Sequence, residues 1–335
     1  MDPSLFKTTK TQRGFTYSYF WSPPFPTLNK KPTLLFAHGF PEGSYLWRHQ
    51  VPFFQRLGYG ALVPEFLGYG GTDKPTDIAV YTGSGHAQDI VDILDAEGLD
   101  KVVVISHDWG VYPASRLLNY HPHRVSACAF LAVGYQPPFA PGQDLVSQYE
   151  AIKEKMGYDA FAYQRFFIQS DAAEIIEKNI DSFICLSFPP EPSFWLETEC
   201  VEGVARSFVE SGRITDLPAY ITPEDKEHLK KALLSDGMAG RLCWYKAMAE
   251  QVIAKDDASE YIPESASYIP HPFLFVACTD DVLFLPANED AVHAKYVTGP
   301  LTRRQLEGAG HWGAESHKEE FNGILVEWLE ALEKV

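Results

Sequence analysis

Basic residues are scarce in this chain of 335 residues, where 28 lysines and arginines face 45 aspartates and glutamates. The formal net charge of -17 argues against nucleic-acid binding, because that function needs a basic face. No apolar run approaches the length of a membrane span, and the polar stretch 1–13 lacks the apolar core of a secretory signal. We therefore predict a cytoplasmic protein with no membrane span and no nucleic-acid partner.

Cysteines are also few. Five of them are scattered along the chain and mostly set in apolar runs, at positions 128, 185, 200, 243 and 278. An odd number without paired spacing is typical neither of a disulfide framework nor of a zinc site. We predict reduced core cysteines.

What is present is enough apolar sequence for a large core, since 45% of the residues are hydrophobic and 22% are charged. Buried strands are predicted over 33–37, 59–64, 102–105 and 125–133, helices over 44–57, 85–98 and 109–120, and an antiparallel edge strand over 14–21. Strands that alternate with helices indicate a mostly parallel sheet with right-handed crossovers.

This alternation stops at Gly134, and no buried-strand pattern returns until Pro272. The spacing between them is helical, and capping boxes are predicted at 171–174 and 222–225. Strands at 273–278 and 301–306 and a helix at 318–332 then complete the sheet pattern. We predict an α/β core from 1–134 and 266–335, interrupted by a helical module at 135–265 that is too long for an ordinary loop.

The strand at 102–105 leads into Ser106-His107-Asp108-Trp109-Gly110, directly before a helix. Small residues two positions on either side of a central side chain are typical of the nucleophile elbow, a turn too sharp for larger neighbours. Here the central residue is Asp108, whose carboxylate can attack carbon and form an ester. The alternative is an aspartate that only caps the helix.

Two further groups follow the predicted strands near the end of the chain. Asp281 comes after 273–278 and His311 after 301–306. The order nucleophile, acid, histidine is that of α/β-hydrolases, and ligands bind at the carboxyl edge of such sheets. Asp280 is the alternative acid, and a solvated loop histidine is the alternative for His311.

Longer motifs join these residues. They are His38-Gly39-Phe40-Pro41, the elbow, Asp281-Val282-Leu283 with Pro286, Gly310-His311-Trp312, and two segments in the helical module, 162–167 and 243–248. Together they resemble the soluble epoxide hydrolases over nearly the whole chain. The resemblance implies an α/β-hydrolase fold with a mostly parallel central sheet, flanking helices and an inserted all-helical cap. It also assigns ring-opening roles to Tyr163 and Tyr245.

The implied reaction begins when Asp108 attacks an epoxide carbon while Tyr163 and Tyr245 supply hydrogen bonds and a proton to the leaving oxygen. His311, oriented by Asp281, then activates the water that cleaves the ester. No metal or organic cofactor is required by this chemistry. The catalytic residues that the resemblance implies thus come from both the cap and the core.

The backbone amides of Phe40 and Trp109 are the expected donors to the oxyanion of the ester. Phe40, Trp109, Gln164 and Trp312 are expected to line the pocket of a small apolar epoxide. The resemblance is compatible with a monomer or a homodimer. It is equally compatible with a role in detoxification and with a role in metabolite processing.

Two other readings remain. Haloalkane dehalogenases share the fold and an aspartate elbow, but they resemble one another in an asparagine where this chain has Phe40, and they lack paired cap tyrosines. A non-catalytic small-molecule receptor on the same fold is the second. Elsewhere, His38 and His107 are predicted to be structural, and the glycine-rich stretch 68–75 is predicted to be a surface turn and not a phosphate loop.

Overall fold

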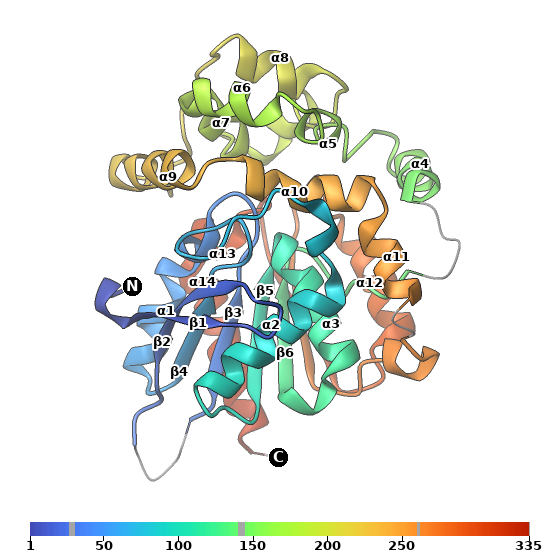
Figure 1. The fold of residues 1–335 in the computed structure, drawn as a ribbon. Helices are drawn as coiled ribbons and strands as arrows, with labels where there is room; N and C mark the ends of the chain where they lie inside the picture. The colour runs from blue at the N-terminus through green and yellow to red at the C-terminus, as the bar shows by residue number, and fades with distance from the viewer. Residues whose placement is uncertain (27–30, 140–144, 260–261, 335) are drawn as a thin grey trace.

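The computed structural model describes residues 1–26, 31–139, 145–259 and 262–334, and its fold is drawn in Figure 1. An eight-stranded sheet forms its centre. In sheet order, the strands are β1 (Phe6–Lys10), β2 (Thr16–Ser22), β4 (Gly60–Pro64), β3 (Thr33–Ala37), β5 (Val102–His107), β6 (Val125–Leu131), β7 (Phe273–Cys278) and β8 (Leu301–Leu306). Only the pairs β1–β2 and β2–β4 are antiparallel. The predicted mostly parallel sheet is confirmed.

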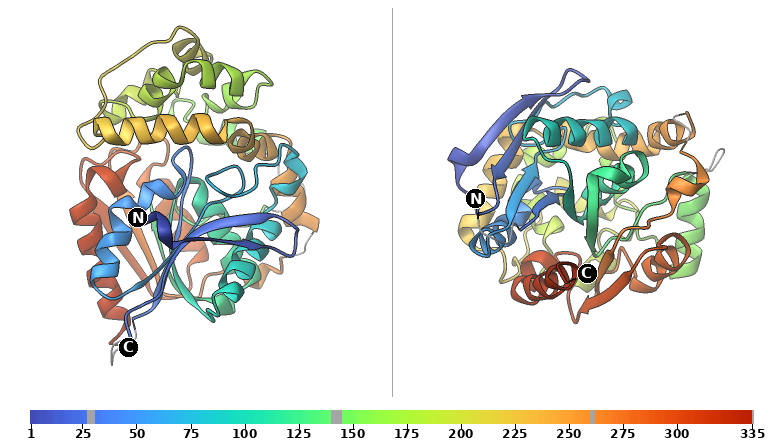
Figure 2. Two further views of the ribbon diagram at one scale, coloured as in Figure 1. Left: turned by 60° about the vertical axis from the view of Figure 1, so that its left-hand side comes forward. Right: turned by 90° about the horizontal axis from the view of Figure 1, so that it is seen from below.

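Helices cover both faces of this sheet, as the views in Figure 2 show. The core helices are α1 (Gln50–Arg56), α2 (Gly83–Ala96), α3 (Val111–Tyr120), α12 (Pro286–Tyr296), α13 (Gly313–Ser316) and α14 (Lys318–Leu332), with short 3-10 turns η1 (Pro3–Leu5), η2 (Gly43–Arg48), η3 (Ile78–Val80), η4 (Asp108–Gly110) and η5 (Pro122–Arg124). The predicted ranges of β3, β7, β8 and α14 match to the residue.

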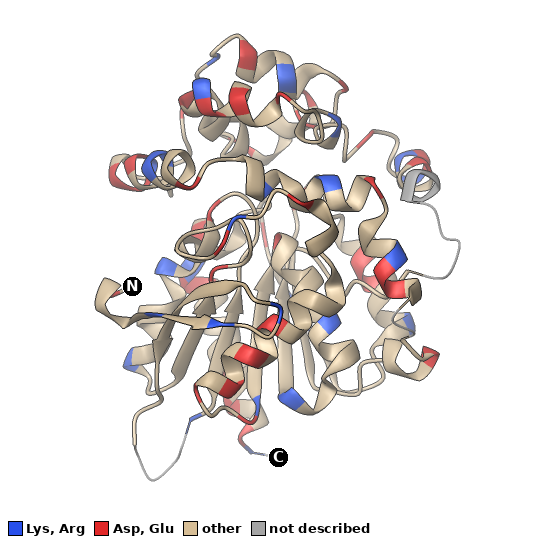
Figure 3. Cartoon of the chain, viewed as in Figure 1, with Lys and Arg blue, Asp and Glu red and all other residues tan. Residues whose placement is uncertain are grey.

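Side-chain alternation divides the core into two clusters. Val103 and Ile105 of β5 pack in the cluster that includes α1 and α14, while Val102 and Val104 pack in the cluster that includes α2 and α3. The central strands β3, β5, β6 and β7 are mostly apolar and lack Lys, Arg, Asp and Glu (Figure 3). A strand buried on both faces needs such a continuous apolar run, which explains why the sequence identified it.

The structure corrects the prediction of the edge strand. The sequence predicted an edge strand at 14–21, but β2 has neighbours on both sides and β1 forms the edge. Phe6–Lys10 escaped notice because it carries two lysines and two threonines that are mostly exposed. Lysines on an edge strand are a common protection against pairing with another chain.

The described residues between β6 and β7 form helices and turns but no strand. They are α4 (Leu145–Met156), α5 (Gln164–Phe167), α6 (Ala172–Lys178), α7 (Ile180–Ser187), η6 (Pro192–Leu196), α8 (Val204–Glu210), α9 (Pro223–Asp236), α10 (Ala239–Ala249), α11 (Val252–Ser259) and η7 (Glu264–Ser267). Figure 2 shows α9 lying across the upper end of the core.

The two predicted capping boxes have different outcomes. The Thr222 hydroxyl accepts a hydrogen bond from the backbone amide of Asp225, and the Asp225 carboxylate accepts one from the backbone amide of Thr222, so the box at the start of α9 is confirmed. Asp171 has helical backbone angles and no side-chain capping bond, so the box predicted for α6 is wrong. Its carboxylate pairs with Arg206 instead. No helix in the described part of the chain is long and apolar enough to cross a membrane.

Candidate active site

The sharp turn after β5 holds Asp108 at a backbone φ of 52°, in the left-handed region that residues with side chains rarely adopt. Close packing surrounds the turn. A Cβ at Gly110 would collide with the carbonyl of Ala37, and a Cβ at Gly39 would collide with the Asp108 carboxylate. The N-cap of α3 is Gly110, so the alternative of a helix-capping aspartate is wrong. The backbone strain is local to the residue predicted to react.

The Asp108 carboxylate is held from two directions. Its Oδ1 accepts a hydrogen bond of 2.7 Å from the backbone amide of Phe40, and its Oδ2 lies 3.4 Å from Nε2 of His311. The amide of Trp109 also hydrogen-bonds this carboxylate. Burial alone would raise the pKa of Asp108, but these partners lower it below its ordinary value. The two predicted oxyanion donors therefore both reach the predicted nucleophile.

His311 lies between two carboxylates. Its Nδ1 is 2.8 Å from Oδ2 of Asp281, while Oδ1 of Asp281 accepts the backbone amides of Leu283 and Phe284. Asp280 is exposed, and within the described residues its carboxylate accepts only from its neighbour Thr279, so Asp281 and not Asp280 is the carboxylate that contacts His311. Burial would lower the pKa of His311, but the charges of Asp281 and Asp108 raise it to about 10.

Two other histidines near the site support the backbone. His107 is fully buried, and its Nε2 lies 2.8 Å from the carbonyl oxygen of His311. His38 accepts from the amide of Phe66 at Nε2, so the proton on Nδ1 faces the carbonyl of Gly39 at 3.0 Å. Burial lowers the pKa of His38 to about 3 and that of His107 to about 4. Both stay neutral, in agreement with their predicted structural roles.

Tyr163 and Tyr245 come from different parts of the helical region and meet above Asp108. Tyr163 is the residue before α5, and Tyr245 lies within α10. Their ring centroids are 6.0 Å apart, and both rings are buried. Gln164 Nε2 lies 3.4 Å from the Tyr163 hydroxyl, and the Trp109 side chain hydrogen-bonds Tyr245. Burial raises the pKa of each phenol well above its ordinary value, so both remain protonated.

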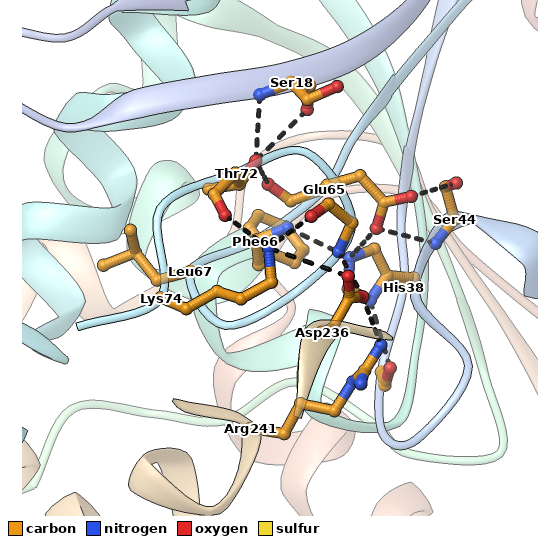
Figure 4. A network of polar contacts seen from close by, with 12 residues as sticks. Ser18, His38, Ser44, Glu65, Phe66, Leu67, Thr72, Lys74, Asp236 and Arg241 are labelled. Atoms are coloured by element: carbon orange, nitrogen blue, oxygen red, sulfur yellow. Dashed lines mark hydrogen bonds and ion pairs between the residues drawn. The ribbon is translucent and has the colours of Figure 1, made fainter. Parts of the chain in front are cut away.

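The helix that carries Tyr245 is attached to the loop after β4. Trp244 Nε1 donates to the carbonyl of Leu67 at 2.9 Å, and Asp236 accepts both the amide of Gly70 and the Arg241 guanidinium. Figure 4 shows Asp236 and Arg241 in a network of polar contacts that extends to the His38 ring. The stretch 68–75 was predicted to be a surface turn, but its first residues are buried under α10. Tyr245 thus depends on a core loop.

Two cavities meet at the predicted nucleophile, and both include Asp108 and Tyr163. The larger, of about 380 Å³, is also lined by the predicted pocket residues Trp109 and Gln164. The smaller, of about 30 Å³, is lined by the other two predicted pocket residues, Phe40 and Trp312, and by His311 and Tyr245. The structure therefore brings every predicted site residue to one of these cavities or directly against a residue that lines it.

Sequence reasoning missed two acidic side chains here. Glu199 lines the smaller cavity, and Glu289 lines the larger one, where it accepts the backbone amide of Gly134. Burial raises the pKa of Glu199 to about 8 and that of Glu289 to about 7. Neither belongs to a motif, and nothing in the sequence separates them from the other acidic residues. Among the described residues, no group of three or more side chains forms a metal site.

Comparisons with known proteins agree with this geometry. A family model described as the alpha/beta hydrolase fold matches residues 32–167. The chain is 28% identical to bifunctional epoxide hydrolase 2 of Sus scrofa over 334 residues, which cover 98% of this chain but 58% of that protein. It is also 28% identical to epoxide hydrolase A of Mycobacterium tuberculosis over 311 residues, or 90% and 91% of the two chains.

Solved structures of epoxide hydrolases are also similar to this chain. Epoxide hydrolase A from Mycobacterium thermoresistibile matches with a TM-score of 0.79 and 27% identity, over 97% of this chain and 98% of the other. An epoxide hydrolase from an endophytic Streptomyces has a TM-score of 0.82 at 24% identity, over 98% and 96%. The predicted α/β-hydrolase fold is confirmed.

The close contact under α10 predicts an asymmetry between two glycines. Both Gly68 and Gly98 have positive φ angles, but a Cβ at Gly68 would lie 2.8 Å from the backbone of Gly240, whereas one at Gly98 would meet nothing within 4 Å. We expect Gly98→Ala to cost about 1 kcal/mol from its backbone angle alone. Gly68→Ala should cost about 1–3 kcal/mol more, because α10 must move. Chemical denaturation measures both, and equal losses would contradict this packing.

The charges around His311 predict a pH dependence of stability. Because its pKa of about 10 in the folded protein lies above the ordinary 6.5, the imidazolium stabilises the fold fully below pH 6.5. That contribution is lost as the pH rises from 6.5 through 10. The unfolding free energy of the wild type, relative to His311→Gln, should fall by a few kcal/mol across this window. The exposed His123→Gln is the control, and a constant difference for His311→Gln would refute the charge assignment.

Proposed function

We propose that this chain, an α/β hydrolase homologous to the epoxide hydrolases, converts an apolar epoxide to a vicinal diol through a covalent ester on Asp108. One observation carries the proposal. The buried phenols of Tyr163 and Tyr245 line the same cavity as Asp108. A cluster of one carboxylate and two neutral phenols suits a substrate whose leaving oxygen needs a proton.

The leaving group distinguishes this reaction from displacement of halide. A halide ion departs as a stable anion and needs no proton, whereas the alkoxide of an opened epoxide is strongly basic. Phenols that stay protonated at neutral pH can hydrogen-bond that oxygen and then protonate it. The raised pKa values of Tyr163 and Tyr245 keep them in the form that donates.

In the first half-reaction, the Asp108 carboxylate attacks one epoxide carbon as the carbon–oxygen bond breaks. The electron pair moves to the epoxide oxygen, which takes a proton from a phenol and becomes a hydroxyl. The strained backbone at Asp108 aims the carboxylate at the cavity, and the ion pair with His311 keeps it charged. The product is a hydroxyalkyl ester.

In the second half-reaction, His311 acts as the general base for water. While Asp108 is charged, His311 is an imidazolium and cannot take a proton. Ester formation removes one of the two negative charges that raise the histidine pKa, so the imidazole becomes available only after alkylation. Water attacks the ester carbonyl, and the amides of Phe40 and Trp109, which already bond Asp108, stabilise the oxyanion.

The helices of residues 135–265 act in this proposal as a cap that closes the site from water. They carry both tyrosines, Gln164 and much of the wall of the larger cavity, whose volume of about 380 Å³ suits a small organic molecule. All five cysteines are free and buried, which favours a reducing compartment such as the cytoplasm. The proposed reaction is compatible with a monomer or a homodimer.

The first test is diol formation from a racemic aryl epoxide by the purified protein. The double variant Tyr163→Phe and Tyr245→Phe should lose about 100-fold or more in kcat/KM, because the leaving oxygen then has no acid. Tyr149→Phe is the matched control. Its hydroxyl bonds Gln164 and Met248, and it lines only the larger cavity of the two described.

Other products would overturn the proposal in distinct ways. Halide release from a haloalkane without diol formation would select the dehalogenase reading, in which the tyrosines have no chemical role. Ligand binding without turnover of any epoxide would select a receptor. A double variant as active as Tyr149→Phe would keep the reaction but refute the role of the phenols.

The covalent route predicts where the oxygen of water goes. In a single turnover with enzyme in excess and in ¹⁸O water, the label should enter the Asp108 carboxylate and the diol should remain unlabelled. His311→Gln should trap the ester, so that intact mass rises by the mass of the epoxide. Label in the first-turnover diol would mean that water attacks the epoxide directly.

A further inference from the structure

Glu199 is a buried acid that the proposed reaction leaves without a role. Its side chain is 5% exposed and lines the small cavity together with Asp108, Tyr163 and His311. Within the described part of the chain, no hydrogen-bond donor reaches its carboxyl group. An ionised carboxylate in such a place costs far more free energy than a neutral acid does. The group therefore rests in its protonated form.

Electrostatics support the same protonation state. Burial raises the pKa of Glu199 to about 8, with His311 opposing the shift and Asp108 and Asp281 adding to it. The titratable groups that face Glu199 are Asp108, Tyr163, Cys200, Asp281 and His311. At neutral pH the group is a carboxylic acid within the field of the reacting residues.

The segment around Glu199 contacts both Tyr163 and His311, the two residues that transfer protons in the proposed reaction. The carbonyl of Glu199 accepts the amide of Tyr163 at 2.8 Å. Four residues earlier, the Trp195 ring lies 5.7 Å from the His311 ring. The shared cavity of about 30 Å³ is large enough for a water molecule, which can bridge groups that do not touch.

The proposed reaction leaves a proton in the wrong place. After ring opening, Tyr163 has given its proton to the substrate oxygen and is a phenolate. At the same time His311 still carries the proton that it must lose before it can activate water. One proton transfer from His311 to Tyr163 corrects both, but no hydrogen bond in the described structure joins these side chains.

We propose that Glu199 relays this proton through water in the small cavity, an inference that rests on the proposed epoxide hydrolysis. The Glu199 carboxylic acid gives its proton to the Tyr163 phenolate and becomes a carboxylate. The His311 imidazolium then gives its proton to the Glu199 carboxylate. Tyr163 and Glu199 end neutral, as they began, and His311 ends as the neutral base. No oxidant, reductant or further reactant is consumed.

The test follows the formation and decay of the ester in a single turnover, by rapid quenching and intact mass measurement after mixing with an aryl epoxide. Glu199→Gln keeps the size and polarity of the side chain but cannot carry the proton, so the ester should form at the wild-type rate but be hydrolysed about 10- to 100-fold more slowly. Glu197→Gln is the matched control, because Glu197 is exposed two residues away. It should form and hydrolyse the ester at the wild-type rates.

The pH profile separates a relay from a structural role. Glu199 must be protonated to start the relay, so the wild-type rate of ester hydrolysis should fall as the pH rises through about 8. In Glu199→Gln this fall should be absent. A slow variant that retains the fall near pH 8 would overturn the relay, as would a variant with the wild-type rate and profile.

Folding of the variants is checked with Glu199→Leu. Because the buried acid has no donor in the described structure, leucine should melt at the same temperature as the wild type or higher. If both substitutions unfold the protein, Glu199 is a structural residue and the relay is wrong. A wild-type protein that forms no ester with any epoxide overturns the proposed function itself, and unchanged ester hydrolysis in Glu199→Gln overturns the relay alone.

Discussion

The interaction on which the site depends is the pairing of one imidazole with two carboxylates in a buried space. His311 binds Asp281 at Nδ1 and faces Asp108 at Nε2. Burial of three ionisable groups would be costly if any charge lacked a partner, and here the two carboxylates and the imidazolium stabilise one another. Backbone amides satisfy the remaining oxygens of both acids. The charges are thus held by the ends of β3, β5, β7 and β8, which is why the sheet must be regular beneath them.

The position of the second tyrosine rests on a separate set of contacts. The loop after β4 holds α10 through Trp244, Asp236 and the close approach of Gly68 to Gly240. The same loop is anchored to the elbow side by the His38 ring. A displacement of the loop would therefore affect the positions of both Asp108 and Tyr245. The core and the helical region are in direct contact at this point.

Much of the fold could be predicted because its central strands carry continuous apolar runs, such as Val102–Ile105, that have few other interpretations. The edge strand β1 could not, since its lysines and threonines face solvent and resemble a polar terminus. Helix capping likewise depends on contacts that the local sequence does not always reveal. The Thr222 box formed, but Asp171 found a partner in Arg206, a residue 35 positions away that no local pattern reveals.

For the site, residue types in chain order identified Asp108, Asp281 and His311, while the tyrosines needed the resemblance to a family. Aromatic residues in helices are usually core, so Tyr163 and Tyr245 carry no local signal of their own. Glu199 could not be predicted from the sequence for a different reason. Its distinction is the absence of donors in a small cavity, and that property exists only once distant segments have packed together.

The small cavity has a further consequence, for the choice of nucleophile in the second half-reaction. An ester on Asp108 would be just as susceptible to an alcohol or an amine as to water, and either would turn a hydrolase into a transferase. The cavity that His311 shares with Asp108 has a volume of about 30 Å³, which admits water but leaves little room for a carbon chain. A cavity of about 100 Å³ also reaches His311, but Asp108 does not line it. Selectivity for hydrolysis over alcoholysis would then come from the volume left between the base and the ester, and it would persist even in solutions rich in competing alcohols.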